Sequence, residues 1–251
     1  MRKKYILFID SGIGGISTLC SAIKKINNNY IYYADNLHAP YGKLSKTQIF
    51  TYLKNIISLL KQEYNISVVV LACNTATTSA INNLRESFKD ITFIGTEPAV
   101  MLAKKLNYKK IACIATLATV KQEKYLELCN SLNAYVKHIS MPNLATNIEK
   151  YFFNPSINNY IDILKDIFYI KSKITDCDCL VLGCTHYVMI KDILKKYISI
   201  PLIDGNNGVV NLLLKTQKSL EKSSVMIFLS NNSNELKQKY IKILNQTLAK
   251  T

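Results

Sequence analysis

The chain contains an internal repeat, which constrains its fold more than any other feature of the sequence. Three pairs of short segments recur in the same order: KYILFIDSG (4–12) with KIACIATLA (110–118), VVLACNT (69–75) with LVLGCTH (180–186), and FIGTEPAV (93–100) with LIDGNNGV (202–209). Each segment contains an apolar run of strand length that gives way to small or polar residues. We therefore expect two similar halves built around equivalent strands.

Short apolar runs typical of strands alternate with helical patterns along the chain, which predicts an α/β fold with parallel sheets covered on both faces. One helix is expected to start at Ser45, where SKTQ has capping-box spacing, another at Pro98, and the last spans 233–248. The expected strands are Tyr5–Ile9, Tyr30–Ala34, Ser67–Ala72, Thr92–Ile94, Lys110–Ala115, Ala134–Ile139, Cys179–Leu182, Pro201–Ile203 and Val225–Leu229.

Charge and hydropathy exclude several classes of function. The formal net charge is +15, but the lysines are scattered and form no basic stripe interleaved with aromatic residues, so nucleic-acid binding is not expected as the main function. A positive field can still attract a small anionic substrate. No apolar run approaches the roughly 20 residues that span a bilayer. The apolar run Tyr5–Ile9 is cut short by Asp10, which argues against a secretory signal and for a cytoplasmic protein.

The seven cysteines are an odd number in a chain without an export signal, so disulfides are not expected. Cys73 and Cys184 differ from the rest because the repeat places each at the carboxyl end of a strand, directly before a predicted helix. Ligands of open parallel sheets bind beyond these strand ends. Two like domains that face each other would therefore bring the two thiols to opposite sides of one cleft.

Two opposed thiols suggest three chemistries. A redox pair usually uses a C-x-x-C loop, which these cysteines do not form. A metal site needs three or four ligands, and His186 with two cysteines is short of that number. Cys177 and Cys179 are two apart, and we interpret them as buried residues that share one strand face. The third chemistry is general acid–base catalysis, in which one cysteine, as a thiolate, removes a proton from a stereocentre. The other cysteine, as a thiol, returns a proton to the opposite face. This pattern favours a cofactor-free racemase or epimerase without a metal.

Polar residues at equivalent strand ends support this interpretation. Asp10 and Ser11 precede the glycine-rich turn GIGG (12–15), whose backbone N–H groups suit an anion such as a carboxylate. His186 follows Cys184 by two residues, whereas His38 and His138 have no such neighbour. The remaining candidates are substrate-binding groups or, alternatively, helix N-caps: Asn74, Thr75, Thr116, Thr119 and Thr185.

At these residues the sequence resembles the glutamate racemases of the aspartate/glutamate racemase superfamily. The resemblance covers most of the chain and rests on FIDSGIGG (8–15), YYADNLHAPYG (32–42), LACNTATT (71–78), IGTEPAV (94–100), IATLATV (114–120) and LVLGCTHY (180–187). It implies two pseudo-symmetric parallel-sheet α/β domains with the active site in the cleft between them. The first domain would comprise 1–97 plus 208–251, and the second 98–207.

The resemblance further implies cofactor-independent interconversion of L- and D-glutamate, which supplies D-glutamate for peptidoglycan. Cys73 and Cys184 would be the catalytic acids and bases, with Asp10 near the first and His186 near the second. Glu149 falls where family members carry a glutamate that assists the second thiol, although Met141 replaces the cysteine of the preceding Cys-Pro motif. The implied substrate contacts are Ser11, Pro40, Tyr41, Gly42, Asn74, Thr75, Thr116, Thr119 and Thr185.

Alternatives remain open at this point. Pocket depth sets substrate length and cannot be read from the sequence, so an aspartate racemase or a related two-cysteine racemase fits as well. A protein that keeps the fold without catalysis is a further alternative, which the presence of both cysteines opposes. Family analogy also suggests a homodimer, and leaves contact with gyrase or nucleic acid as a side role.

Overall fold

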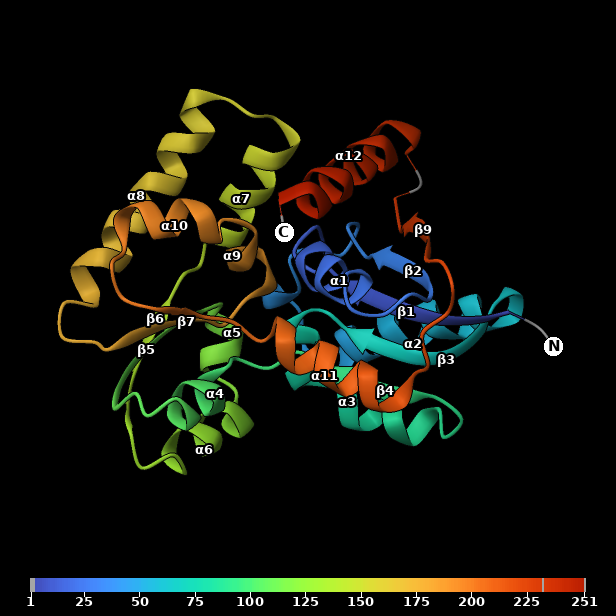
Figure 1. The fold of residues 1–251 in the computed structure, drawn as a ribbon, viewed down its shortest axis with the longest axis horizontal. Coiled ribbons are helices and arrows are strands. Elements are labelled where there is room, and N and C mark those ends of the chain that lie inside the picture. The colour runs from blue at the N-terminus through green and yellow to red at the C-terminus, as the bar shows by residue number, and fades with distance from the viewer. Residues whose placement is uncertain (1–2, 232, 251) are drawn as a thin grey trace. The chain divides into compact units, whose positions relative to one another are not determined.

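The computed structural model describes residues 3–231 and 233–250, and this part of the chain divides into two compact units. The first unit combines Met1–Thr96 with Asn206–Thr251, and the second is the continuous segment Glu97–Gly205. The boundaries between the units therefore lie at 96/97 and 205/206, whereas the sequence placed them at 97/98 and 207/208. Figure 1 labels most of the helices and strands of each unit.

The first unit is built on a five-stranded sheet with the order β4-β3-β1-β2-β9, in which every neighbouring pair is parallel. Its strands are β1 (Lys4–Asp10), β2 (Asn29–Ala34), β3 (Asn65–Leu71), β4 (Thr92–Gly95) and β9 (Ser224–Leu229). Its helices are α1 (Ile16–Ile23), the 3-10 turn η1 (Tyr41–Lys43), α2 (Lys46–Glu63), α3 (Asn74–Ser87), α11 (Asn206–Thr216) and α12 (Asn234–Lys250).

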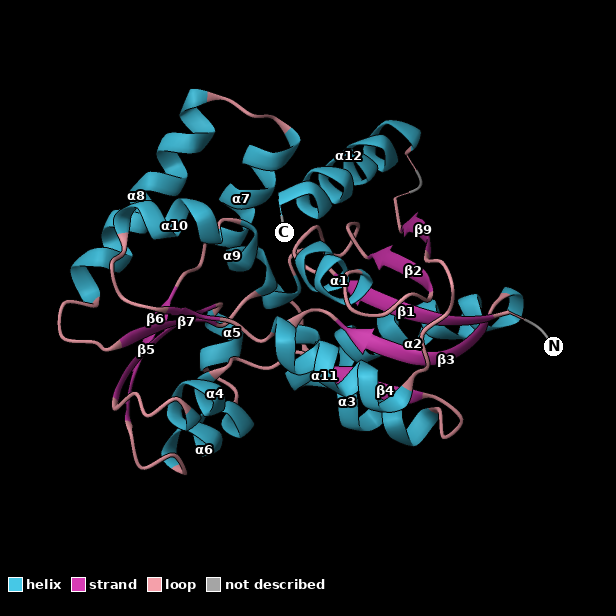
Figure 2. Cartoon of the chain, viewed as in Figure 1, coloured by secondary structure: helices cyan, strands magenta, loops and turns pink. Residues whose placement is uncertain are grey.

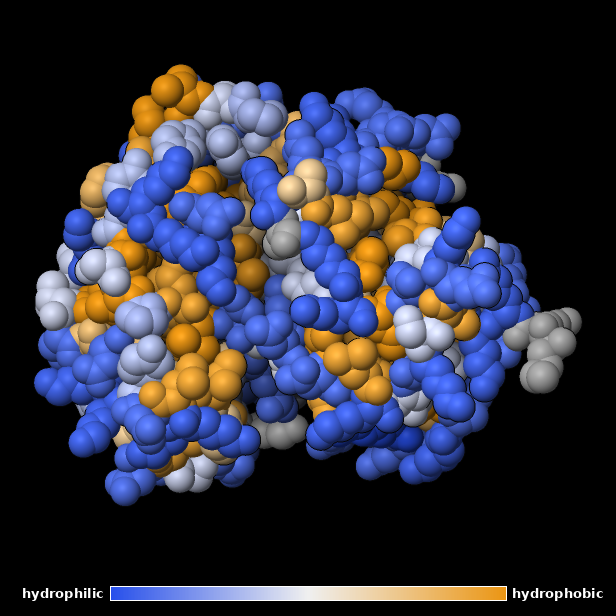
Figure 3. Space-filling view, viewed as in Figure 1, coloured by the Kyte–Doolittle hydropathy of each residue, from blue (hydrophilic) through white to orange (hydrophobic). Residues whose placement is uncertain are grey.

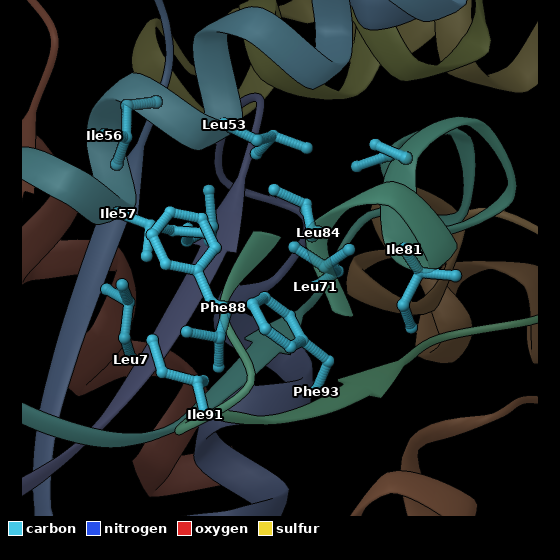
Figure 4. Packing of buried hydrophobic residues seen from close by; sticks show 14 of the residues in the cluster. Leu7, Leu53, Ile56, Ile57, Leu71, Ile81, Leu84, Phe88, Ile91 and Phe93 are labelled. Atoms are coloured by element: carbon cyan, nitrogen blue, oxygen red, sulfur yellow. The ribbon is translucent and has the colours of Figure 1, made fainter. Parts of the chain in front are cut away.

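Alternate residues of the central strands point to opposite helical layers. Leu7 of β1 and Leu71 of β3 pack with Leu53 of α2, Leu84 of α3 and Phe93 of β4 in one buried cluster (Figure 4). Helix α1 packs instead against α11 and α12. Because both faces are covered, the strands are near-continuous apolar runs, as buried parallel strands require.

The second unit repeats this plan with a four-stranded parallel sheet of order β6-β5-β7-β8. Its strands are β5 (Lys110–Ala115), β6 (Tyr135–Ser140), β7 (Cys179–Leu182) and β8 (Leu202–Ile203). Its helices are α4 (Val100–Lys105), α5 (Leu117–Val120), α6 (Glu123–Asn130), α7 (Leu144–Phe153), α8 (Ile157–Lys173), α9 (Thr185–Met189) and α10 (Lys191–Tyr197). Figure 2 shows strands and helices alternating in both units.

The strand orders confirm the internal repeat. When β1, β2, β3 and β4 are matched with β5, β6, β7 and β8, the two sheets have the same order, and β9 is an additional edge strand of the first. The matched strands carry the repeated segments, since β1 and β5 hold the first pair, β3 and β7 the second, and β4 and β8 the third. The predicted fold class, two pseudo-symmetric parallel-sheet units, is thus confirmed.

Most predicted elements are present with bounds shifted by one or two residues, and the capping box is confirmed in detail. The Ser45 hydroxyl accepts the Gln48 N–H at 3.2 Å, and the Gln48 side-chain oxygen accepts the Ser45 N–H at 2.9 Å. The prediction of a helix start at Pro98 is wrong, because α4 begins at Val100. The Val100 N–H donates to the Pro98 carbonyl at 2.8 Å, so the chain makes a tight turn at Ala99 before the helix begins.

The surface reflects the lysine-rich composition. On the face shown in Figure 3, hydrophilic residues cover most of the area, and hydrophobic residues lie in smaller patches among them. Within residues 3–231 and 233–250, no helix is both long enough and apolar enough to cross a membrane.

Candidate active site

The sequence-predicted polar residues of the first unit gather at the carboxyl ends of two neighbouring strands. Asp10 is the last residue of β1, Cys73 follows β3 by two residues, and these strands pair in parallel. Both side chains are buried, Asp10 completely and Cys73 with 8% exposure. The turn 40–42 after β2 joins them, since Tyr41 lies in the same buried cluster as Cys73. We call these residues together the Cys73 site, which comprises Asp10, Ser11, Pro40, Tyr41, Gly42, Cys73, Asn74 and Thr75.

The Asp10 carboxylate is held by the turn that follows it. Its Oδ1 accepts the Gly12 N–H at 2.8 Å and lies 3.5 Å from the Ser11 hydroxyl. Gly15 permits this arrangement, because a Cβ there would lie 2.8 Å from the Ala72 Cβ and 3.0 Å from the Asp10 Cβ. One N–H of the glycine-rich turn thus binds the protein's own carboxylate.

Cys73 is the N-cap of α3, and its sulfur accepts the Ala76 N–H at 3.5 Å. Asn74 and Thr75 form the first turn of this helix and are buried. The N-terminus of a helix favours a negative charge, so the position of Cys73 suits a thiolate.

The turn that carries Pro40, Tyr41 and Gly42 is attached to the end of β2 by a buried hydrogen bond. The Tyr41 hydroxyl donates to Oδ2 of Asp35 at 2.7 Å. Burial and the Asp35 carboxylate raise the pKa of Tyr41 above its usual value, and the nearby Cys73 and Asp10 act in the same direction. The phenol therefore stays protonated and keeps donating to Asp35.

The second unit holds an equivalent group, the Cys184 site, at the carboxyl ends of β5 and β7. It comprises Thr116, Thr119, Glu149, Cys184, Thr185 and His186. Thr116 caps α5, where its hydroxyl oxygen accepts the Thr119 N–H at 3.3 Å. Cys184 occupies the N-cap position of α9, and Thr185 is the first residue of that helix. Each thiol thus follows the equivalent strand of its unit and precedes a helix.

Three side chains of this site form a chain of contacts. The Cys184 sulfur lies 3.8 Å from Nδ1 of His186, and Nε2 of His186 lies 3.0 Å from Oε1 of Glu149. Burial alone would lower the pKa of His186, but its bonds to Cys184 and Glu149 raise it well above 6.5. A histidine held between a carboxylate and a sulfur is placed to exchange a proton with that sulfur.

The remaining five cysteines have a different environment. Burial raises the pKa of Cys20, Cys113 and Cys179 to about 12, and it also raises the pKa of Cys129 and Cys177. These groups are thiols at neutral pH and therefore poor nucleophiles and bases. Within the described residues, no group of three or more His, Cys, Asp or Glu side chains is arranged to hold a metal ion.

The interpretation that Cys177 and Cys179 share one strand face is wrong. Cys179 begins β7 and packs with Val181 on one face, whereas Cys177 packs with Leu180 and Leu182 on the other. Cys177 lies outside the strand, in the loop that precedes it, so the alternation of strand side chains does not apply to it.

Gly183 positions Cys184, and replacing it by alanine should displace the thiol. A Cβ at residue 183 would lie 2.8 Å from the Ile114 carbonyl oxygen, a backbone atom of the adjacent strand. We expect Gly183→Ala to lower the free energy of unfolding by about 1–3 kcal/mol and to reduce turnover. Urea denaturation and steady-state kinetics measure the two effects.

The matched control is Gly208→Ala in α11, where an added Cβ meets nothing within 4 Å. Helix propensity predicts that this variant is unchanged or more stable by up to about 1 kcal/mol. Equal behaviour of the two variants would contradict the role assigned to Gly183.

Sequence reasoning missed two residues beside the Cys73 site: Asp35, which contacts Tyr41, and His38, which contacts Asp35. Asp35 directly follows β2, so its position after a strand was an available signal. His38 had no chemical neighbour in the sequence, yet its Nδ1 lies 2.8 Å from Oδ1 of Asp35. His138, the other histidine that was set aside, contacts the Tyr125 hydroxyl at 3.0 Å and belongs to neither site.

Comparison with known proteins identifies the family of the chain. A family model described as Asp/Glu/Hydantoin racemase matches residues 27–213. The chain is 38% identical over 250 residues to a protein named glutamate racemase from Clostridium novyi (strain NT), with 94% of each chain covered.

Solved structures show the same fold. A crystal structure of Escherichia coli glutamate racemase in complex with L-glutamate and the activator UDP-MurNAc-ala superposes with a TM-score of 0.83, at 24% identity, and covers 98% of this chain and 96% of that one. Glutamate racemase from Aquifex pyrophilus is 29% identical and has a TM-score of 0.76, covering 96% and 95%. The chain therefore belongs to the Asp/Glu/Hydantoin racemase family of enzymes, and within it groups with the proteins named glutamate racemase.

Proposed function

We propose that this protein interconverts L- and D-glutamate without a cofactor, using Cys73 and Cys184 as two acid–base groups on one substrate. The observation that carries the proposal is the repeated placement of a thiol at a helix N-cap beyond equivalent strands of the two units. Membership of a racemase family whose curated relatives are named glutamate racemases supports the choice of reaction and substrate. The D-glutamate would serve peptidoglycan synthesis in the cytoplasm.

The mechanism follows from the chemistry of the two sites. The thiolate of one cysteine takes the α-proton of glutamate and becomes a thiol, while the electron pair stays on the α-carbon. The other thiol then donates its proton to the opposite face and becomes a thiolate. The configuration at the α-carbon is inverted, and the two cysteines have exchanged protonation states. The reverse reaction runs through the same steps with the roles exchanged.

Each cysteine would have its own supporting groups. On the Cys184 side, His186 accepts or returns a proton, and Glu149 holds the imidazolium in place. On the Cys73 side, the buried Asp10 is the candidate assisting group. The carbanion needs donors already in position when charge develops, and the buried Asn74, Thr75, Thr119 and Thr185 are candidates for that role, together with the half-buried Thr116.

The proposal is tested by incubating the purified protein with L-glutamate in D₂O, with a reductant and no added cofactor. Circular dichroism follows the loss of optical activity, and NMR follows replacement of the α-proton by deuterium. We expect both signals to decay, and sedimentation of the same sample to report a homodimer. Turnover of aspartate with no change in glutamate would contradict the assignment of glutamate as the substrate and would leave the two-thiol mechanism standing. Inactivity toward both amino acids would overturn the proposed function.

A further inference from the structure

The Cys73 site is extended by a carboxylate that sequence reasoning passed over. The Asp35 side chain is only 1% exposed, and each of its oxygens has a separate partner. Oδ2 accepts the Tyr41 hydroxyl at 2.7 Å, and Oδ1 lies 2.8 Å from Nδ1 of His38. The Asp35 backbone N–H donates to the Asp10 carbonyl at 2.8 Å, which attaches this residue to the end of β1. Asp35 thus links His38 to both Tyr41 and the strand that carries Asp10.

The His38 ring is itself held in a defined orientation. It stacks on the Tyr52 ring of α2, with ring centroids 3.7 Å apart and planes 15° from parallel. A carboxylate only accepts hydrogen bonds, so Nδ1 of His38 must carry the proton that joins it to Asp35. Helix α2 therefore supports His38 by stacking, and His38 supports Asp35 by donating to it.

The consequence reaches the turn that contains the candidate substrate contacts. Tyr41 is buried and is the first residue of η1, between Pro40 and Gly42. Because Asp35 accepts a hydrogen bond from the Tyr41 hydroxyl, the direction of the Tyr41 side chain is fixed by the position of that carboxylate. A buried carboxylate that loses one of its donors is held less firmly and costs more to keep in place.

We propose that His38 is a positioning residue, which acts through Asp35 and Tyr41 to hold the turn 40–42 in the conformation that binds substrate. The proposal rests on the proposed function, because it assigns the turn a role in glutamate binding. It predicts that a loss of the His38 donor weakens substrate binding more than it slows the chemical step. Turnover by the wild-type protein is measured first, and its absence would overturn the proposed function. Failure of the positioning role appears differently, as an unchanged KM in a folded His38 variant of an active enzyme.

The test compares three substitutions of His38 in the full chain. His38→Phe keeps a ring that can stack on Tyr52 and removes the donor. His38→Asn keeps a short N–H donor and removes the ring. His38→Ala removes both. We expect KM for glutamate to rise about three- to tenfold in His38→Phe and His38→Ala with kcat changed less than twofold. His38→Asn should restore KM to within about twofold of the wild type.

Two further measurements separate positioning from general stability. Thermal denaturation identifies any variant that fails to fold, and only folded variants are compared. The matched control is His138→Ala, whose side chain contacts Tyr125 within the second unit, and it should leave both constants unchanged. A folded His38→Phe with wild-type KM would overturn the proposal. So would a folded His38→Asn whose KM is as high as that of His38→Ala.

Discussion

Replacing Cys73 or Cys184 by serine is expected to lower kcat for racemisation by about 10²–10⁴-fold in both directions, the range that a positioned acid or base contributes. Serine is close in size to cysteine, but its hydroxyl is far less acidic than a thiol, so it neither removes nor returns the α-proton efficiently. Polarimetry with each enantiomer of glutamate measures the effect.

Isotope exchange gives the same variants a sharper readout. Each variant keeps one thiol, which under the proposed mechanism reaches one face of the α-carbon. In D₂O, we expect Cys73→Ser to exchange the α-proton of one enantiomer only, and Cys184→Ser to exchange that of the other. Cys177→Ser is the matched control, because this buried cysteine lies outside both sites, and it should retain activity within about twofold. Near-wild-type racemisation by either site variant would rule out the two-thiol mechanism.

Glu149→Gln is expected to give the second largest loss, a decrease in kcat of about tenfold to a hundredfold. Glutamine keeps the shape of the side chain and removes the charge that holds the His186 imidazolium. The imidazole then protonates less readily and is less able to return a proton to Cys184. Steady-state kinetics across pH measures the change, and the alkaline limb of the profile should move to lower pH.

The same variant tests the raised pKa of His186 through stability. The pKa of His186 in the folded chain lies well above its ordinary value of 6.5. A folded pKa above the unfolded one adds stability that is fully present below about pH 6.5 and is lost as pH rises through the folded pKa. In Glu149→Gln the folded pKa falls, so this stability should disappear at a lower pH than in the wild type.

Thermal midpoints between about pH 5 and pH 9 compare the two curves. Glu235→Gln is the matched control, because its partner Lys239 forms a surface pair in which Glu235 is 80% exposed, and such pairs contribute little. Parallel curves for the wild type and Glu149→Gln would show that the carboxylate does not set the protonation of His186.

The sequence predicted the strands and the positions of both candidate thiols because buried parallel strands leave a strong local signal. The runs that end before Cys73 and Cys184 are continuous and apolar, and the internal repeat makes them equivalent. The matching strand orders of the two sheets follow from that repeat. Local pattern was sufficient here because the feature being predicted is itself local.

The misses concern contacts between distant elements. Glu149 lies on α7 and His186 on α9, 37 positions away, and only the family resemblance placed Glu149 in the site. No periodicity of apolar residues in the sequence indicates that the turn after β2 stacks His38 on Tyr52 of α2. The error at Pro98 has a related cause, because proline suits a first helical turn and a preceding tight turn equally well. Which of the two forms depends on how the chain leaves β4.

The discontinuity of the first unit has a consequence for synthesis on the ribosome. The second unit is one continuous segment, so all of its internal contacts become available once residue 205 has emerged. The first unit must wait for β9 to cover the free edge of β2, and for α11 and α12 to cover α1. During that interval the nascent chain exposes an open strand edge and an apolar helix face, which are the features that promote aggregation. The segment from residue 206 onward therefore supplies the elements that close this strand edge and cover this helix face.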